Sequence, residues 1–292
     1  MKRILAMLTA AALLLTAAGC AGETELAEKV PDEYYSDLPA SGSRVERITY
    51  VSRDYYYDSS REVRKPALVY LPADYSEETP CGVLILCHGL TGSETEWGFT
   101  KNNRKGWNLA DRLFAEGAVK NLIIVMPNCR SAWNFADTDT GNTRVFDLFG
   151  QELRNDLIPN IDEHYNTYAD RDHRAIAGLS IGATQAVNIG LCECLDLFSA
   201  FGVFSAGKMT LDSARIPEKL QAFPEDCTVR CLYCICGAWD DALDYSAAIL
   251  NPLPDDPRLT AENCFWQRCG GGHNFKVWYL GLYNFLRILG GL

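Results

Sequence analysis

The sequence has little positive charge and few histidines. It carries 27 Lys and Arg against 38 Asp and Glu, which gives a formal net charge of -11, and only four histidines in 292 residues. Because an acidic protein repels phosphate backbones, we do not expect nucleic acid as a partner. No internal repeat is visible. Hydrophobic residues still make up 48 % of the chain, which excludes general disorder and suffices for one large domain with a buried core.

The apolar run at the N-terminus is too short to span a bilayer comfortably. Lys2 and Arg3 precede the apolar stretch 4–18, and small residues end it, as in a cleaved signal peptide. Ala-Ala-Gly directly before Cys20 resembles the bacterial lipoprotein cleavage box, which implies that Cys20 is lipidated and becomes the new N-terminus. Several acyl chains on one residue would anchor an exported protein stably on the membrane surface. An ordinary signal peptide with an incidental cysteine is the alternative.

The composition predicts three regions along the chain. Residues 1–20 form the signal peptide. Residues 21–43 are rich in Glu, Asp, Pro, Ser and Gly and predict a flexible tether. Over residues 44–292, strand-like and helix-like stretches alternate, which predicts one α/β domain with a doubly wound, mostly parallel sheet. The sequence does not indicate an oligomeric state.

The apolar patterns predict two kinds of strand. Val45–Val51 alternates apolar and polar residues like a half-exposed strand, and Ala67–Leu71 follows as its antiparallel hairpin partner. Continuous apolar runs predict buried parallel strands at 83–87, 122–126, 175–179, 201–204 and 229–236. Helical patterns cover 107–116, 146–165, 181–191 and 276–289. Antiparallel strands at the N-terminal edge of a parallel sheet are typical of the α/β-hydrolase fold.

Cysteine is unusually frequent for an exported chain. There are 12 cysteines, and the odd number that follows Cys20 cannot all pair internally. Cys231 and Cys234 have the spacing of half a zinc site, but no second pair lies near them and their segment predicts a buried strand. We therefore expect buried free thiols and no metal. A disulfide that involves Cys264 and Cys269 stays open.

A G-x-S-x-G pattern lies at Gly178-Leu179-Ser180-Ile181-Gly182. An apolar strand precedes it and a helix with small residues follows it, which is the context of a nucleophile elbow. The glycines are needed because a side chain at this sharp turn would clash with neighbouring backbone. A glycine-rich turn with a capping serine is the alternative. Since the helix N-terminus would direct free N–H groups at a developing oxyanion, we favour Ser180 as a nucleophile.

A serine nucleophile needs a base that exchanges a proton near neutral pH, and an acid that orients the base. In the fold that carries a nucleophile elbow, the chain order is serine, acid, histidine. Of the four histidines only His273 follows Ser180, so His273 is the expected base. The acid is expected in the loop after the second strand that follows the elbow. Asp240 and Asp241 both lie there, and both are candidates.

The loop after strand 83–87 is expected to complete an oxyanion hole. The backbone N–H of Leu90 would supply one donor and that of Ile181, directly after the nucleophile, the other. His88 is expected to hold this loop by hydrogen bonds. A role for His88 as a metal ligand is not supported, because no partner ligands lie near it in the sequence.

The segment 128–144 follows a predicted parallel strand, at the edge where such sheets bind ligands. It contains Arg130, Trp133 and Asn134, whose side chains suit stacking on and hydrogen bonding to sugar or phenolic groups. An ordered surface loop is an equally good interpretation. Trp239 is a further candidate for the pocket wall, or for the core.

From Arg44 to the C-terminus the sequence resembles the esterase D and feruloyl esterase family of α/β-hydrolases. The matching motifs are VYLP (69–72), HG (88–89), EW (96–97), VMP (125–127), LIP (157–159), RDHRAIAGLSIG (171–182) and GGGH (270–273). The resemblance implies ester hydrolysis without a cofactor. It leaves the substrate open, because the family also contains acetylxylan and siderophore esterases, S-formylglutathione hydrolases and mycolyltransferases. Ala183 departs from the pattern, since relatives usually have glycine there.

The resemblance also implies a choice of acid. Its pattern of glycine, two residues and aspartate falls on Asp240, so we expect a triad of Ser180, His273 and Asp240. Asp241 is then expected to cap a helix that starts near Ala242. The expected function is two-step acyl transfer that removes feruloyl or acetyl groups from plant cell-wall polysaccharide. A siderophore or other small-ester esterase, or a carbohydrate-binding lipoprotein on an inactive hydrolase fold, are the alternatives.

Overall fold

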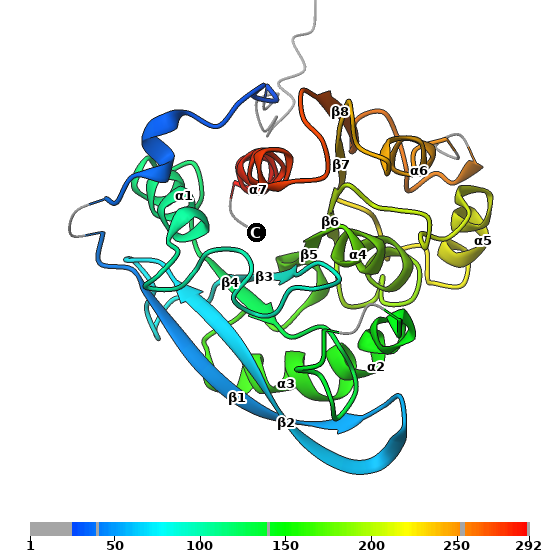
Figure 1. Ribbon diagram of the computed structural model, residues 1–292, viewed down its shortest axis with the longest axis horizontal. Coiled ribbons are helices and arrows are strands. Elements are labelled where there is room, and N and C mark those ends of the chain that lie inside the picture. Colours follow the sequence, from blue (N-terminus) through cyan, green and yellow to red (C-terminus); the bar gives the residue numbers. More distant parts are fainter. Residues whose placement is uncertain (1–24, 39–40, 139–140, 252–254, 291–292) are drawn as a thin grey trace, which may run out of the picture.

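An eight-stranded sheet organises the chain, in the order β1-β2-β4-β3-β5-β6-β7-β8 (Figure 1). The computed structural model describes residues 25–38, 41–138, 141–251 and 255–290. The strands are β1 (Arg44–Asp54), β2 (Asp58–Leu71), β3 (Gly82–Cys87), β4 (Leu122–Pro127), β5 (Arg174–Leu179), β6 (Ala200–Phe204), β7 (Cys231–Gly237) and β8 (Cys264–Cys269). β1 pairs antiparallel with β2 and β2 pairs antiparallel with β4, whereas β3 to β8 all run parallel to one another. The mostly parallel sheet with an antiparallel N-terminal edge is therefore confirmed.

Helices cover both faces of the sheet. They are α1 (Lys105–Ala115), α2 (Phe149–Glu152), α3 (Ile158–His164), α4 (Ile181–Gln185), α5 (Ile216–Leu220), α6 (Leu243–Ala248) and α7 (Phe275–Leu289). Figure 1 shows α1 and α7 on one side of the sheet and α2, α3 and α4 on the other. Among the helices of the described residues, none is both long and apolar enough to cross a membrane.

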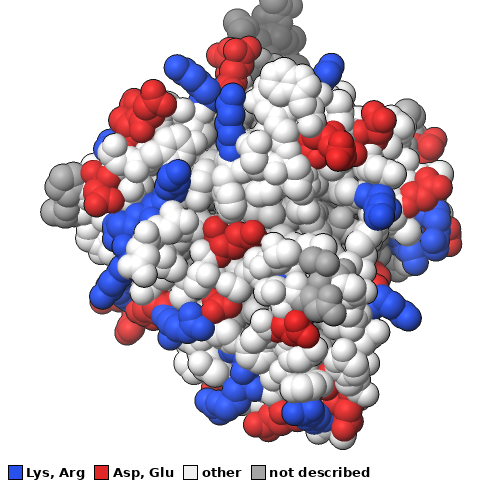
Figure 2. Space-filling model, viewed as in Figure 1, with Lys and Arg blue, Asp and Glu red and all other residues white. Residues whose placement is uncertain are grey.

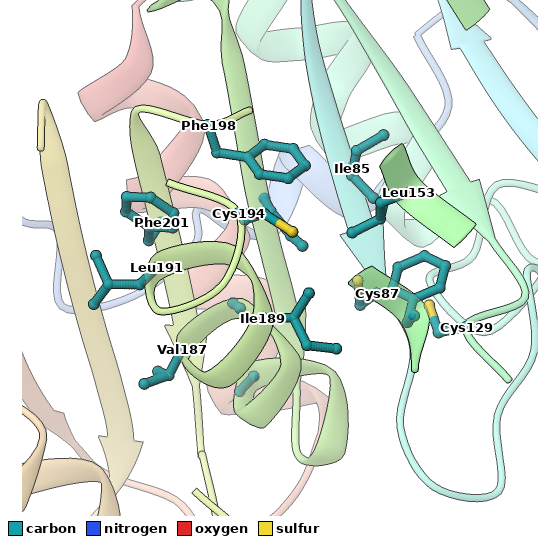
Figure 3. Packing of buried hydrophobic residues seen from close by; sticks show 14 of the residues in the cluster. Ile85, Cys87, Cys129, Leu153, Val187, Ile189, Leu191, Cys194, Phe198 and Phe201 are labelled. Carbon is teal, nitrogen blue, oxygen red and sulfur yellow. The ribbon is translucent and has the colours of Figure 1, made fainter. Parts of the chain in front are cut away.

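Two apolar clusters sandwich the sheet because successive side chains of a strand point to opposite faces. In β3, Val83, Ile85 and Cys87 enter one cluster, whereas Leu84 and Leu86 enter the other. Figure 3 shows part of the first cluster, in which Ile189 points toward Ile85 and Cys87 of β3 whereas Val187 and Leu191 point the opposite way. Burial on both faces explains why the central strands read as continuous apolar runs.

The predicted long helix at 146–165 is wrong as a single element. The chain instead forms α2, a π-helical turn at Leu153–Leu157 and then α3. Pro159 lies at the start of α3 and has no N–H to continue an α-helical hydrogen-bond series. The backbone therefore leaves the regular α pattern in the turn before it.

The tether prediction is wrong for residues 25–38. Val30 and Tyr34 are buried against the face that α1 and α7 cover. The Asn284 side chain in α7 accepts a hydrogen bond from the Ala27 N–H and donates one to its carbonyl, both at 2.9 Å. The segment is polar in composition but contributes two apolar anchors to the domain. The predicted signal peptide and Cys20 lie outside the described residues.

All eleven cysteines of the described residues are free thiols, and ten of them are buried. This confirms the expectation of buried free cysteines, and Cys264 and Cys269 are both unpaired. Burial raises the pKa of Cys81 to about 11 and that of Cys192 to about 12. The thiols therefore behave as small apolar core residues near neutral pH.

Candidate active site

Ser180 lies on the sharp turn between β5 and α4, with φ 55° and ψ -116°. A non-glycine residue at positive φ is strained and persists only where its surroundings enforce it. A Cβ added to Gly178 would lie 2.5 Å from the carbonyl carbon of Gly182, and one added to Gly182 would lie 2.6 Å from the His88 oxygen. Both positions therefore require glycine. The turn that carries Ser180 packs directly against the loop after β3.

The structure brings Ser180, His273 and Asp240 into one hydrogen-bonded series. Ser180 Oγ lies 2.9 Å from His273 Nε2, and His273 Nδ1 lies 3.0 and 3.1 Å from the two carboxylate oxygens of Asp240. The carboxylate can only accept, so Nδ1–H donates to it and Nε2 is left to accept the serine proton. The Asp240 side chain is fully buried, while that of His273 is 42 % exposed. This arrangement can generate a nucleophilic serine that substrate can reach.

Two loops fix the distance between the carboxylate and the imidazole. The Trp239 N–H donates to the Gly271 carbonyl at 2.9 Å. A Cβ on Gly237 would lie only 2.4 Å from that same carbonyl oxygen, so the loop after β7 and the loop before α7 run backbone against backbone. The rings of Trp278 and His273 pack in a T-shaped arrangement, with 5.0 Å between their centroids.

Asp241 does not cap α6, and that expectation is wrong. The Ala242 N–H is bound by Asp240 Oδ1 at 2.9 Å, and α6 begins without a side-chain cap. The buried Asp240 carboxylate thus bonds to both the histidine and the start of the helix. Asp241 is left exposed at the mouth of the site.

The two expected oxyanion donors lie on elements that meet at the elbow. Ile181 is the first residue of α4, and the first N–H groups of a helix have no intrahelical acceptor. Leu90 lies in the loop after β3, whose backbone at Cys87 and His88 abuts Gly182. Both N–H groups are therefore on backbone that the elbow holds in place.

His88 fixes the peptide that carries the Leu90 N–H. Its Nδ1 donates to the Gly89 carbonyl at 2.7 Å, and its Nε2 accepts from the Cys129 N–H at 3.0 Å. Burial lowers the pKa of His88 to about 3, so the ring stays neutral and keeps Nε2 as an acceptor. Since a trans peptide is planar, holding the Gly89 oxygen also sets the direction of the Leu90 N–H.

The Arg130 side chain also holds the loop that carries Leu90. Its Nη1 donates to the Gly92 carbonyl at 2.9 Å and its Nη2 to the Leu90 carbonyl at 2.5 Å. The residue is only 3 % exposed. The guanidinium, which the sequence suggests as a substrate contact, is therefore engaged in holding the loop that carries Leu90.

Trp133 and Asn134 are not brought to Ser180. Trp133 is 48 % exposed, with the Arg61 guanidinium 4.6 Å above its ring. Asn134 lines a separate pocket of about 80 Å³ that includes no member of the series Ser180–His273–Asp240. Trp239, in contrast, lies beside the loop that carries His273 and is 79 % exposed.

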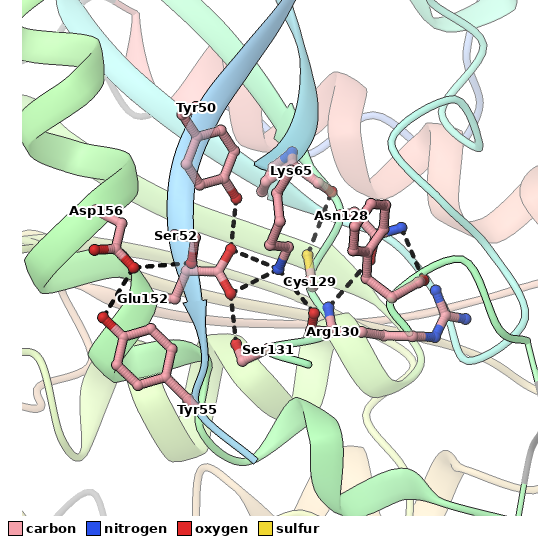
Figure 4. Close-up of polar contacts among 12 residues, drawn as sticks. Tyr50, Ser52, Tyr55, Lys65, Asn128, Cys129, Arg130, Ser131, Glu152 and Asp156 are labelled. Carbon is pink, nitrogen blue, oxygen red and sulfur yellow. Dashed lines mark hydrogen bonds and ion pairs between the residues drawn. The ribbon is translucent and has the colours of Figure 1, made fainter. Parts of the chain in front are cut away.

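A buried ionic network underlies this part of the site (Figure 4). Lys65 Nζ lies 2.6 Å from the Glu152 carboxylate, and both side chains are fully buried. Lys65 also donates to the Arg130 carbonyl at 2.8 Å. Tyr50 and Ser131 donate to Glu152 at 2.5 and 2.7 Å. The network has no local signal in the sequence, because Lys65 ends a polar stretch of β2 and resembles an ordinary exposed lysine there.

Two pockets border the residues beside Ser180. One, of about 450 Å³, is lined by Gly207, Lys208, Asp240, Asp241, Ala242, Tyr245 and His273. The other, of about 270 Å³, is lined by Phe146, Asp147, Ile181, Thr184, Gln185, Asn188, Ile189, Glu193 and Met209. Figure 2 shows charged side chains of both signs interspersed around the outline of the face seen in Figure 1, with uncharged residues over most of its middle. The net negative charge does not gather into a single patch on this face.

Comparison with known proteins identifies a family to which this chain is similar and solved structures that share its fold. Residues 60–279 match the family model Esterase, described as "Putative esterase". An endo-1,4-beta-xylanase/feruloyl esterase of Xylanibacter ruminicola is 28 % identical over 205 residues, which are 68 % of this chain and 26 % of that protein. This chain thus spans about a quarter of that relative's length.

Two solved structures share the fold. The CE1 ferulic acid esterase from the anaerobic fungus Anaeromyces mucronatus, solved without substrate, has a TM-score of 0.72 at 22 % identity, covering 91 % of this chain and 97 % of that one. The feruloyl esterase module from Clostridium thermocellum, complexed with sinapinate, has a TM-score of 0.73 at 21 % identity, covering 89 % and 92 %. The expected α/β-hydrolase fold is confirmed.

Proposed function

The chain belongs to the esterase family and is an ester hydrolase, and from this premise we propose that it removes feruloyl groups from plant cell-wall polysaccharide through a triad of Ser180, His273 and Asp240. The observation that carries the proposal is the continuous hydrogen-bonded series from Ser180 Oγ through His273 to a buried carboxylate. The series ends at a serine on a strained strand-to-helix turn, which is how this fold presents a nucleophile.

The proposed reaction has two steps. His273 Nε2 takes the Ser180 proton as Oγ attacks the ester carbonyl, and the N–H groups of Leu90 and Ile181 stabilise the oxyanion. The same Nε2 then protonates the leaving alcohol, which departs and leaves an acyl-serine. In the second step His273 Nε2 takes a proton from water as the water oxygen attacks the acyl carbonyl, and it returns this proton to Ser180 Oγ as the acid departs. Asp240 holds the imidazole in its tautomer and stabilises the imidazolium.

The pocket beside Ile181 favours an aromatic acyl group over acetyl. Phe146, Ile189 and Met209 give it apolar walls, while two amides and two carboxylates add polar groups at Gln185, Asn188, Asp147 and Glu193. A ring with hydroxyl and methoxy substituents matches such a mixture better than a methyl group does. The xylanase/feruloyl esterase relative and the sinapinate-bound module support the same choice of substrate.

A substrate panel tests the proposal. We expect methyl ferulate to be hydrolysed with a higher kcat/KM than p-nitrophenyl acetate or acetylated xylan, and Ser180→Ala to abolish all three activities. A fluorophosphonate probe should label Ser180 in the native protein. Hydrolysis of acetylated xylan but not of methyl ferulate would show that the acyl group is acetyl rather than feruloyl. Hydrolysis of a siderophore ester and of none of the other esters would favour a siderophore esterase. No labelling of the folded protein would favour a carbohydrate-binding lipoprotein on an inactive fold.

We also propose that the protein is exported and anchored to the cell membrane through a lipid on Cys20. The small residues before Cys20 support this proposal. We expect Cys20→Ser to release the protein from the membrane fraction while the purified domain keeps its esterase activity. Cys269→Ser, which removes the partly exposed thiol of the folded domain, is the matched control. Equal membrane partition of the Cys20→Ser variant and the wild type would rule out lipidation there.

A further inference from the structure

We propose that the pocket beside His273 binds the sugar that carries the ester, with Tyr245 and Asp241 as its principal contacts. The inference rests on the proposed function and adds recognition of the leaving alcohol to it. It assigns a role to an exposed aspartate that neither completes the triad nor caps a helix.

The reaction itself determines which pocket receives the alcohol. His273 Nε2 removes the Ser180 proton and delivers it to the leaving oxygen, so that oxygen must lie within hydrogen-bond distance of Nε2. Of the two pockets that border the residues beside Ser180, only the larger one is lined by His273. The alcohol therefore extends into that pocket, and the acyl group occupies the pocket beside Ile181.

The lining of the larger pocket has the chemistry of a sugar site. Tyr245 is 48 % exposed and offers a ring face on which the C–H face of a sugar can stack. The exposed Asp241 carboxylate can accept hydrogen bonds from two neighbouring hydroxyl groups. Within the described residues, neither side chain makes a hydrogen bond, ion pair or ring contact. Their polar groups are thus free to bind a ligand without breaking an existing contact.

The pocket walls are fixed relative to the triad. In α6, the buried Ser246 donates to the Ala206 carbonyl at 2.9 Å, which holds the helix that carries Tyr245 against the loop at Gly207 and Lys208. Trp239 precedes Asp240, is 79 % exposed, and its backbone N–H is bound to the loop of His273.

The test compares two feruloyl esters with different alcohols. Methyl ferulate has no sugar, whereas a feruloylated arabinoxylan oligosaccharide carries the same acyl group on a saccharide. We expect Tyr245→Ala to lower the ratio of kcat/KM for the oligosaccharide ester to kcat/KM for methyl ferulate by about tenfold, since truncation of an aromatic anchor has effects of this order. The loss should lie mainly in KM. Asp241→Asn should lower the same ratio several-fold.

Trp133→Ala is the matched control, because Trp133 is an aromatic residue of equal exposure that lies outside both pockets. It should leave the ratio at the wild-type value. Unchanged ratios in Tyr245→Ala and Asp241→Asn, or a fall in Trp133→Ala instead, would overturn the sugar site while leaving the feruloyl esterase assignment intact. A wild-type protein that hydrolyses neither ester would reject the proposed function itself.

Discussion

Replacing Asp240 by Asn is expected to lower kcat on methyl ferulate by at least about a hundredfold and by up to about 10⁴-fold. The Asn amide would donate to His273 Nδ1, which moves the ring proton to Nε2, where the Ser180 proton must be accepted. The imidazolium that forms during attack would also lose its counter-charge. Because the Asn oxygen can still accept from the Ala242 N–H, the thermal unfolding midpoint should stay within a few degrees of wild type. Steady-state kinetics and a thermal melt measure the two effects separately.

Asp241→Asn provides the control for this experiment. With methyl ferulate, which has no sugar for Asp241 to contact, its kcat should lie within a few-fold of the wild-type value. The reverse ranking of the two variants would transfer the role of triad acid to Asp241. Equal and small effects of both would mean that the hydrogen bonds between Asp240 and His273 do not orient the base.

Lys65→Met is expected to lower the free energy of unfolding by about 3–5 kcal/mol, because it leaves the buried Glu152 carboxylate without its counter-charge. Methionine fills similar space, so loss of packing volume is small. Urea unfolding at neutral pH would measure the change. The variant also removes the donor to the Arg130 carbonyl, so we expect lower esterase activity of the folded protein under native conditions.

An exposed ion pair gives the comparison for this second prediction. Arg154 and Asp196 form a two-bond pair whose side chains are 42 % and 38 % exposed. Arg154→Met should therefore cost about 1 kcal/mol or less. Adding Glu152→Gln to Lys65→Met should recover part of the stability, since it removes the unpaired charge. Equal costs for Lys65→Met and Arg154→Met would show that the buried pair does not carry the stability assigned to it.

The elements that the sequence predicts well are those with a local signal. The runs at 83–87 and 175–179 are apolar on both strand faces, so their burial between two layers follows from periodicity alone. Ser180 is identified by its flanking glycines and His273 by chain order. The last strand, Cys264–Cys269, is only partly buried, and no periodicity identified it.

Other features depend on contacts between residues far apart in the chain. Arg130 resembles a ligand-binding side chain until the fold places the carbonyls of Leu90 and Gly92 against it. Lys65 and Glu152 are 87 residues apart, and nothing local to either indicates the pair. Residues 25–38 lack a periodic apolar pattern, and only the surface of α1 and α7 reveals Val30 and Tyr34 as anchors.

The eleven free thiols have a consequence for how the protein reaches its native state. In the folded core, burial keeps these thiols away from oxidants and raises the pKa of thiols such as Cys81 and Cys192, so that reactive thiolate is scarce there. An unfolded chain has no such protection, and its thiols can exchange freely in an oxidising medium. Folding therefore competes in time with formation of wrong disulfides. Once the sheet has closed over its cysteines, the same residues become chemically inert, so the yield of active enzyme depends on how quickly the chain folds.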